Sequence, residues 1–101
     1  MNCKHEVVRK VAQLFHENGF SVAVNVVVEL REHDLVEVKV CKEEVSGVIN
    51  VLLRRWDAGH YTPEDHSFRF NDVNESTRKL IKEAEEIILR ACGIISPPYV
   101  S

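Results

Sequence analysis

The chain has 101 residues, of which 45% are hydrophobic and 29% are charged, and its net charge is −3 at pH 7. This length suits a single domain, residues 1–101, and the composition is that of a globular protein rather than a disordered one. The acidic balance argues against a protein that holds nucleic acid or an anionic membrane by a positive surface field. The uncharged run from Phe20 to Val28 is too short to cross a bilayer, and the first residues lack the layout of a signal peptide, so a cytoplasmic protein is expected.

The three cysteines are Cys3, Cys41 and Cys92. Their number is odd and no two of them have the C-x-x-C spacing, so neither a disulfide framework nor a zinc site made of cysteines alone is expected. One pair could still form a bridge in a compartment that tolerates it. The sequence contains no glycine-rich phosphate loop and no serine-nucleophile motif, and no cofactor is expected.

The N-terminal segment, residues 3–18, is predicted to form a helix. Its apolar residues recur at helical spacing. They are Val7, Val8, Val11, Leu14 and Phe15. Asn18 and Gly19 follow them and supply the left-handed stop that commonly ends a helix.

Residues 20–41 alternate between apolar and polar side chains on both sides of a short polar break, Glu32-His33-Asp34. A period of two indicates strands with one buried face. We therefore predict a β-hairpin with strands at residues 20–31 and 35–41. A three-residue turn at the polar break would place Val28 opposite Val38 and keep the valines of both strands on one face.

The rest of the chain predicts two more helices and a short strand. Residues 43–56 place apolar side chains on one helical face, with acids in the first turn and arginines in the last, as the helix dipole favours. Residues 57–65 are expected to form a loop, residues 67–70 a third strand, and residues 73–92 a final helix with an apolar stripe. The expected fold is α+β, a small antiparallel sheet built on the hairpin and packed by three helices.

The first predicted strand is long for a domain of this size. The twelve residues from 20 to 31 would extend roughly 40 Å at the usual strand rise. Because the second strand is shorter, residues 20–25 would have no partner within the hairpin, and an unpaired strand edge tends to pair with another chain. Either the strand bends through a bulge near Asn25, or the protein forms a homodimer through the sheet edge or through interleaved elements.

Three charged residues of the hairpin suggest a catalytic alternative. In the predicted register Glu29 lies opposite Glu37, and Lys39 lies diagonal to Glu29 on the same solvated face. Paired carboxylates beside a lysine can hold a divalent metal ion and activate water. This arrangement resembles the restriction-endonuclease-like PD-(D/E)xK nucleases, in which a helix precedes a hairpin that carries an acid and a (D/E)-x-K motif. The resemblance implies a metal-dependent nuclease with Glu37-Val38-Lys39 as the motif and Glu29 in the place of the aspartate.

A metal site in the predicted loop is a further candidate. His60 and His66 flank Glu64 and Asp65 there, and imidazole and carboxylate groups are common ligands of zinc. The histidines match none of the known zinc-binding spacings, so exposed loop histidines are the simpler interpretation.

The sequence favours a non-enzymatic interaction or accessory module that forms a homodimer, because no convergent catalytic cluster stands out. A further protein partner fits the same interpretation, whereas nucleic acid and membranes are not the expected partners. The alternatives are the nuclease-like domain and a nucleic-acid-binding protein that uses Arg54, Arg55 and Trp56 for charge pairing and stacking.

Overall fold

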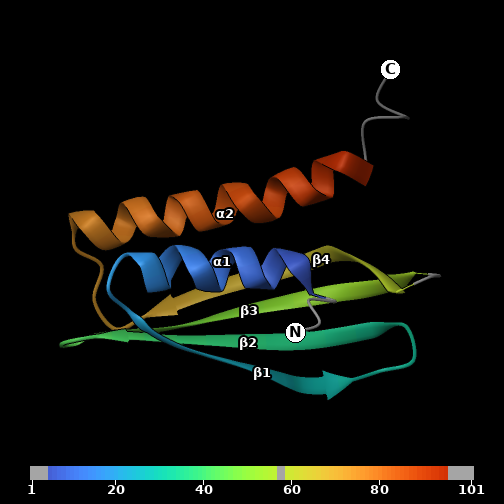
Figure 1. The fold of residues 1–101 in the computed structure, drawn as a ribbon, viewed down its shortest axis with the longest axis horizontal. Helices are drawn as coiled ribbons and strands as arrows, with labels where there is room; N and C mark the ends of the chain where they lie inside the picture. The colour runs from blue at the N-terminus through green and yellow to red at the C-terminus, as the bar shows by residue number, and fades with distance from the viewer. Residues whose placement is uncertain (1–4, 57–58, 96–101) are drawn as a thin grey trace.

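A computed structural model describes residues 5–56 and 59–95 of the chain. The elements in chain order are α1 (Glu6–Glu17), β1 (Ser21–Glu29), β2 (His33–Lys42), β3 (Val45–Trp56), β4 (His60–Phe70) and α2 (Glu75–Ile95). The four strands form one antiparallel meander in the order β1-β2-β3-β4. Both helices lie on the same face of this sheet, and no described element covers the opposite face (Figure 1).

The predicted α+β class is confirmed, but the layout differs in the number of elements. The described chain has four strands rather than three and two helices rather than three. The helices at the two ends agree with the prediction, since α1 falls within residues 3–18 and α2 overlaps residues 73–92. The start of the first predicted helix, at residue 3, lies outside the described residues.

The predicted helix at residues 43–56 is wrong, because this segment is strand β3. Ile49, Val51 and Leu53 alternate with less buried residues and are almost fully buried, which is the period of a strand. Apolar residues on the other face of the same strand, such as Val48, created the apparent helical spacing. The acidic pair Glu43-Glu44 is a tight turn that joins Lys42 to Val45, and not the first turn of a helix.

The predicted loop at residues 57–65 and the short strand at residues 67–70 belong largely to one long strand, β4. Thr62 and Pro63, predicted to lie in a loop, are buried within it. The β3–β4 ladder shifts by one residue between Leu52 and Leu53, and this bulge accommodates the proline. Residues 57–58 lie outside the described part of the chain.

The core lies between the sheet and the two helices. Buried side chains of β2 and β3 pack against buried side chains of the two helices. The buried apolar residues are Val8, Val11, Phe15, Phe20, Val36, Val38, Val40, Ile49, Val51, Leu53, Leu80, Ala84 and Ile88. Side chains of this size contribute about 1.5–3 kcal/mol each when fully buried, so this one layer accounts for most of the hydrophobic stabilisation.

The hairpin of β1 and β2 is confirmed, but its predicted register is wrong by four residues. Val24 pairs with Val38, whereas the sequence predicted Val28 in that position. Residues 21–25 therefore do have partners in β2, and a bulge at Val27 ends the regular ladder. A shift by an even number of residues leaves Val22, Val24 and Val26 on the same face, so their alternation alone could not distinguish the two registers.

A glycine in β3 makes room for the aromatic ring of its cross-strand partner Phe70. A Cβ atom built on Gly47 would lie 2.3 Å from the Phe70 ring, far inside contact distance. The Phe70 ring in turn stacks on Phe15 with centroids 6.0 Å apart, which joins β4 to α1. The glycine at this position is therefore required by the packing of the ring.

We expect Gly47→Ala to destabilise the protein by about 1–3 kcal/mol, because the added methyl group overpacks the site. In a Phe70→Leu background the same substitution should cost less, since the smaller side chain vacates the space. Urea denaturation of the four proteins of this double-mutant cycle measures the difference. An equal cost of Gly47→Ala in both backgrounds would contradict the assignment.

Candidate functional site

A buried carboxylate lies at the end of the sheet where α1 begins. Asp34 of β2 is 0% exposed. His5 Nε2, at the start of α1, lies 2.9 Å from Asp34 Oδ2, and Arg55 of β3 donates from Nη2 to Oδ1. Burial of an unpaired carboxylate is costly, and these two partners on different elements compensate for the loss of water.

Arg55 connects the buried carboxylate to the neighbouring strand and loop. Its Nε donates to the Tyr61 hydroxyl of β4 over 3.3 Å, and its Nη1 donates to the Arg31 carbonyl over 2.7 Å. The Tyr61 ring meets the His5 ring edge to face, with centroids 4.8 Å apart. The group of His5, Asp34, Arg55 and Tyr61, termed here the Asp34 cluster, thus ties α1, three strands and the β1–β2 loop together.

The Asp34 carboxylate and the Arg55 guanidinium are held in their charged forms. Burial raises the pKa of the Asp34 carboxyl, but the hydrogen bonds and charges of His5 and Arg55 lower it further, so that the net pKa lies below its usual value. The hydrogen bond with Tyr61, followed by that with Asp34, raises the pKa of Arg55. Because no part of Asp34 is accessible, we assign the cluster a structural role rather than acid–base chemistry on a ligand.

Sequence reasoning missed this cluster because it placed Asp34 in a solvated turn. One signal was present: Asp34 has the same parity as Val36, Val38 and Val40, all of which face the helices. An acid on the buried parity of a strand requires a cationic partner. That requirement would have argued for an earlier start of β2.

The structure does not bring together the three residues of the predicted nuclease-like site. Glu29 pairs with Asp34, whereas Glu37 pairs with Asn25. Residues directly opposite share a face, and residues three apart on a strand lie on opposite faces, so Glu29 and Glu37 project from opposite faces of the sheet. Only Glu37 and Lys39 are neighbours, with Oε1 and Nζ 4.0 Å apart.

The two candidate metal-binding histidines lie at different points of β4. His60 pairs with Trp56 at the start of the strand, and His66 pairs with Val51 near its middle. His66 Nε2 lies 3.7 Å from Glu85 Oε2 of α2. Among the described residues, no group of three or more histidine, cysteine, aspartate or glutamate side chains is arranged to hold a metal ion. None of the described helices is long and apolar enough to cross a membrane.

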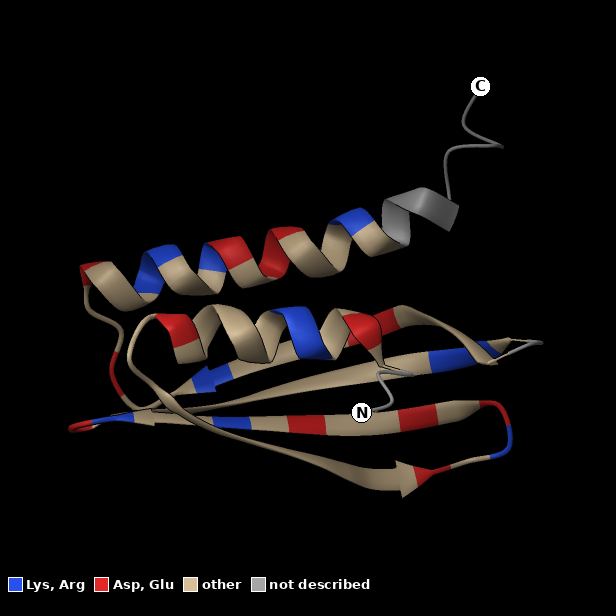
Figure 2. Cartoon of the chain, viewed as in Figure 1, with Lys and Arg blue, Asp and Glu red and all other residues tan. Residues whose placement is uncertain are grey.

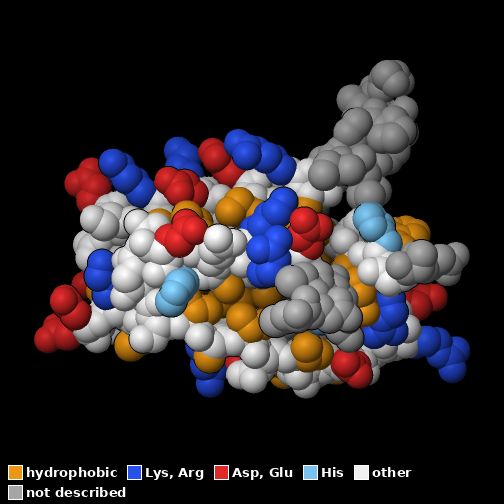
Figure 3. Space-filling view, viewed as in Figure 1, with side chains coloured by type: hydrophobic (Ala, Val, Ile, Leu, Met, Phe, Trp, Pro, Cys, Tyr) orange, Lys and Arg blue, Asp and Glu red, His pale blue; other side chains and the backbone are white. Residues whose placement is uncertain are grey.

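The β1 edge is the most unusual surface of the described chain. Five aliphatic residues along it and just beyond it are between 39% and 54% exposed. They are Val24, Val26, Val27, Val28 and Leu30. On the side where α1 and β1 face the viewer, hydrophobic side chains are visible in the strip between the helix and the strand (Figure 3).

The exposed valines continue a face that is buried on the next strand. Val38 and Val36 of β2 are both 0% exposed. Their direct partners on β1, Val24 and Val26, are 46% and 41% exposed. The apolar face of the sheet therefore extends across β1, whereas its cover by the two helices ends before that strand.

The two edges of the sheet carry different residues. The outer strand β4 contains Pro63 and several charged side chains, which are features that discourage pairing with another chain. From Ser21 to Val28, by contrast, β1 contains neither proline nor a charged residue (Figure 2). A short uncharged segment rich in valine is prone to pair with another strand when it is left exposed. The β1 edge is therefore the candidate interaction site.

Comparison with protein-family models, curated proteins and solved structures gives no match for this chain. Function is therefore inferred from the chemistry of the surface alone.

We expect Asp34→Ala to lower the free energy of unfolding at neutral pH by about 3 kcal/mol, because it leaves Arg55 and His5 without their shared acceptor. Asp34→Asn, which keeps an acceptor but not the charge, should cost less.

Acid should weaken this contribution. Since the pKa of Asp34 is lower in the folded state than in the unfolded chain, its stabilisation is complete above the unfolded value, near 3.8, and is lost as pH falls through the folded value. Urea denaturation of wild type and Asp34→Asn at a series of pH values should show the stability difference shrink in acid. A constant difference down to about pH 2 would contradict the charged assignment.

Proposed function

We propose that the protein is a non-enzymatic interaction module that forms a homodimer through its β1 edge. Two β1 strands pair antiparallel about a two-fold axis, and the two sheets of four strands become one continuous sheet. The main support for this proposal is the difference in exposure between two residues that pair directly across the sheet. Val38 is 0% exposed, and its partner Val24 is 46% exposed although it lies on the same apolar face.

A second copy of the chain fits this edge because the strand is self-complementary. A two-fold axis at Val24 places that residue beside its own copy, and it places Val22 opposite the partner's Val26. Every pair on the helix-covered face is then a valine–valine pair, which is a favourable cross-strand contact. On the other face Ala23 meets the partner's Asn25. No charged group is buried in this arrangement.

The main chain adds to the side-chain contacts. In an edge strand, alternate residues direct their N–H and C=O groups away from the sheet, and an antiparallel partner satisfies them. Strand addition of this kind supplies affinity through the backbone, and the exposed valines supply the apolar contact. A strand from another protein could use the same edge, and the measurements below distinguish that case because the chain alone would then be monomeric.

We expect wild-type protein to be a dimer at tens of micromolar and Val24→Glu to be a monomer. The substitution puts two carboxylates side by side at the two-fold axis and should weaken the dimer at least about a hundredfold. Leu89→Glu is the matched control, because Leu89 is 52% exposed on α2 and lies away from β1. Sedimentation equilibrium of the three proteins tests this. A monomeric wild type, or a Val24→Glu protein that remains dimeric, would overturn the proposal.

The position of the two-fold axis can be tested by cross-linking. In a background with the three native cysteines changed to serine, Val24→Cys should form a disulfide with its own copy, since directly opposed strand residues meet the distance requirement. Asn25→Cys is the neighbouring control, and it should remain largely reduced because two copies of residue 25 lie diagonally, about 7–8 Å apart. Non-reducing gel electrophoresis after mild oxidation measures the fraction of cross-linked dimer. Equal cross-linking of both variants would contradict a two-fold axis at Val24.

A further inference from the structure

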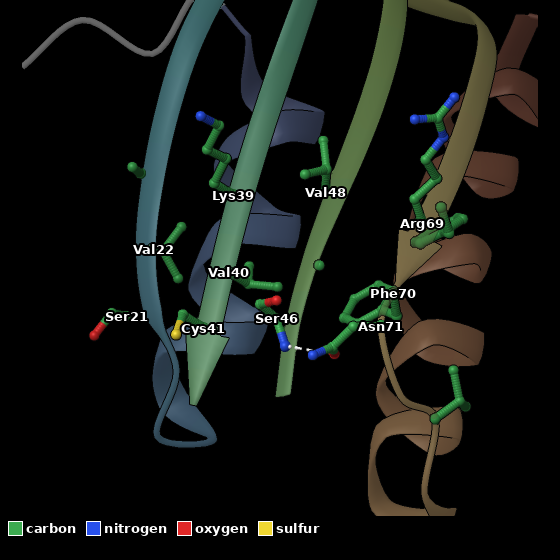
Figure 4. Close-up of a pocket in the computed structure, with 14 residues that line it drawn as sticks. Ser21, Val22, Lys39, Val40, Cys41, Ser46, Val48, Arg69, Phe70 and Asn71 are labelled. Carbon is green, nitrogen blue, oxygen red and sulfur yellow. Dashed lines mark hydrogen bonds between the residues drawn. The ribbon is translucent and has the colours of Figure 1, made fainter. Parts of the chain in front are cut away.

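The uncovered face of the sheet contains a groove of about 940 Å³ that reaches across all four strands. In Figure 4 this face is turned toward the viewer, with the helices behind the sheet. The groove is open to solvent, and its size is that of a site for a small molecule. It lies on the face opposite the core.

Four residues form one row across the groove. Ala23 pairs with Lys39, Lys39 pairs with Val48, and Val48 pairs with Arg69. Directly opposed residues share a face, so all four side chains belong to the uncovered face. Lys39 and Arg69 stand two strands apart, roughly 10 Å, on either side of Val48. Both side chains are long enough to lean over Val48 and reach the same atom.

The two cations of this row are poorly neutralised. Arg69 forms no ion pair with any described residue. The nearest carboxylate to Lys39 is that of Glu37, 4.0 Å away, and the Lys39 side chain is 59% exposed. An ion pair at that distance in water contributes little, so Lys39 remains available to another anion. The row therefore presents one positive charge on each side of the Val48 side chain.

The surface that lines the groove as a whole is mostly apolar. Beyond the charged row, toward the β2–β3 turn, its lining includes Val73, which is 41% exposed. Ser21, Cys41, Ser46 and Asn71 lie at the same end and add small polar side chains. A ligand that matches this surface has one anionic end and an apolar body.

We propose that the groove binds a small amphipathic carboxylate. The carboxylate lies over Val48 between Lys39 and Arg69, and the hydrocarbon body extends along the groove toward Val73. A single negative charge suits two cations in a chain whose net charge is −3, because the remaining acidic groups repel a polyanion. A neutral amphiphile would leave the two cations without a partner.

The groove meets the proposed homodimer interface only at its β1 end, Ser21 to Ala23, and its two cations lie elsewhere. Lys39, Val48 and Arg69 lie on β2, β3 and β4, away from the β1 edge. Antiparallel addition at that edge extends the sheet in its own plane and leaves this face open. The Val24→Glu variant should therefore bind the same ligand as the wild type, so the failure of one proposal does not carry over to the other.

Sodium octanoate is the probe, with octanamide as its neutral isostere. Titration followed by amide NMR shifts should show saturable binding of octanoate, with the largest shifts at residues 39, 48 and 69. The Lys39→Gln/Arg69→Gln variant should bind at least tenfold more weakly. Arg78→Gln/Lys82→Gln, which removes the same charge from exposed positions on α2, should bind like the wild type.

A third variant places an internal competitor in the groove. Val48→Asp puts a carboxylate between the two cations and should abolish octanoate binding, with spectra that otherwise show a folded protein. Octanamide that binds as tightly as octanoate, retention of affinity in the Lys39→Gln/Arg69→Gln variant, or shifts centred elsewhere would each overturn the proposal. No saturable binding up to about 10 mM octanoate would overturn it as well.

Discussion

The buried pairing of Asp34 with Arg55 is the constraint on which the rest of the structure depends. Because Asp34 is fully buried, it must lie inside β2 rather than in a turn, and this fixes how β1 aligns with β2. The loop therefore lies two residues earlier than predicted, at residues 30–32, and the Arg31 carbonyl receives a hydrogen bond from Arg55. His5 extends the same cluster to α1 and sets where the helix begins against the sheet. One charged contact thus determines the register, the loop and the docking of the first helix.

The surface features also follow from that register. With Val24 opposite Val38, the apolar face of the sheet runs out to its first edge, where the two helices no longer cover it. The same alignment carries Lys39 to the other face, in one row with Val48 and Arg69. The candidate interface and the candidate ligand groove are therefore two consequences of the way one hairpin is aligned.

Periodicity in the sequence predicted part of this fold and not the rest. Both helices were found because each has a single apolar stripe, and the first hairpin was found because its valines alternate. Strand β3 was mistaken for a helix because it carries apolar residues on both faces, such as Val48 and Ile49, which imitate helical spacing over a short window. The register could not be read from the valines, since an even shift preserves their faces, and it was Asp34 that decided it. Glu29 and Glu37, paired in the predicted register, lie on opposite faces in the structure because the bulge at Val27 changes the face of the residues that follow it.

Pro63 makes the β4 edge of the sheet unsuited to pairing with a further strand. Proline has no N–H to offer an incoming strand, and the bulge beside it bends β4 away from a flat ladder. Each chain therefore has one sheet edge that favours pairing with another strand, at β1, and one that resists it, at β4. In the proposed dimer the β1 edges of both molecules are occupied by each other, so assembly would stop at a closed pair and would not propagate into a fibre.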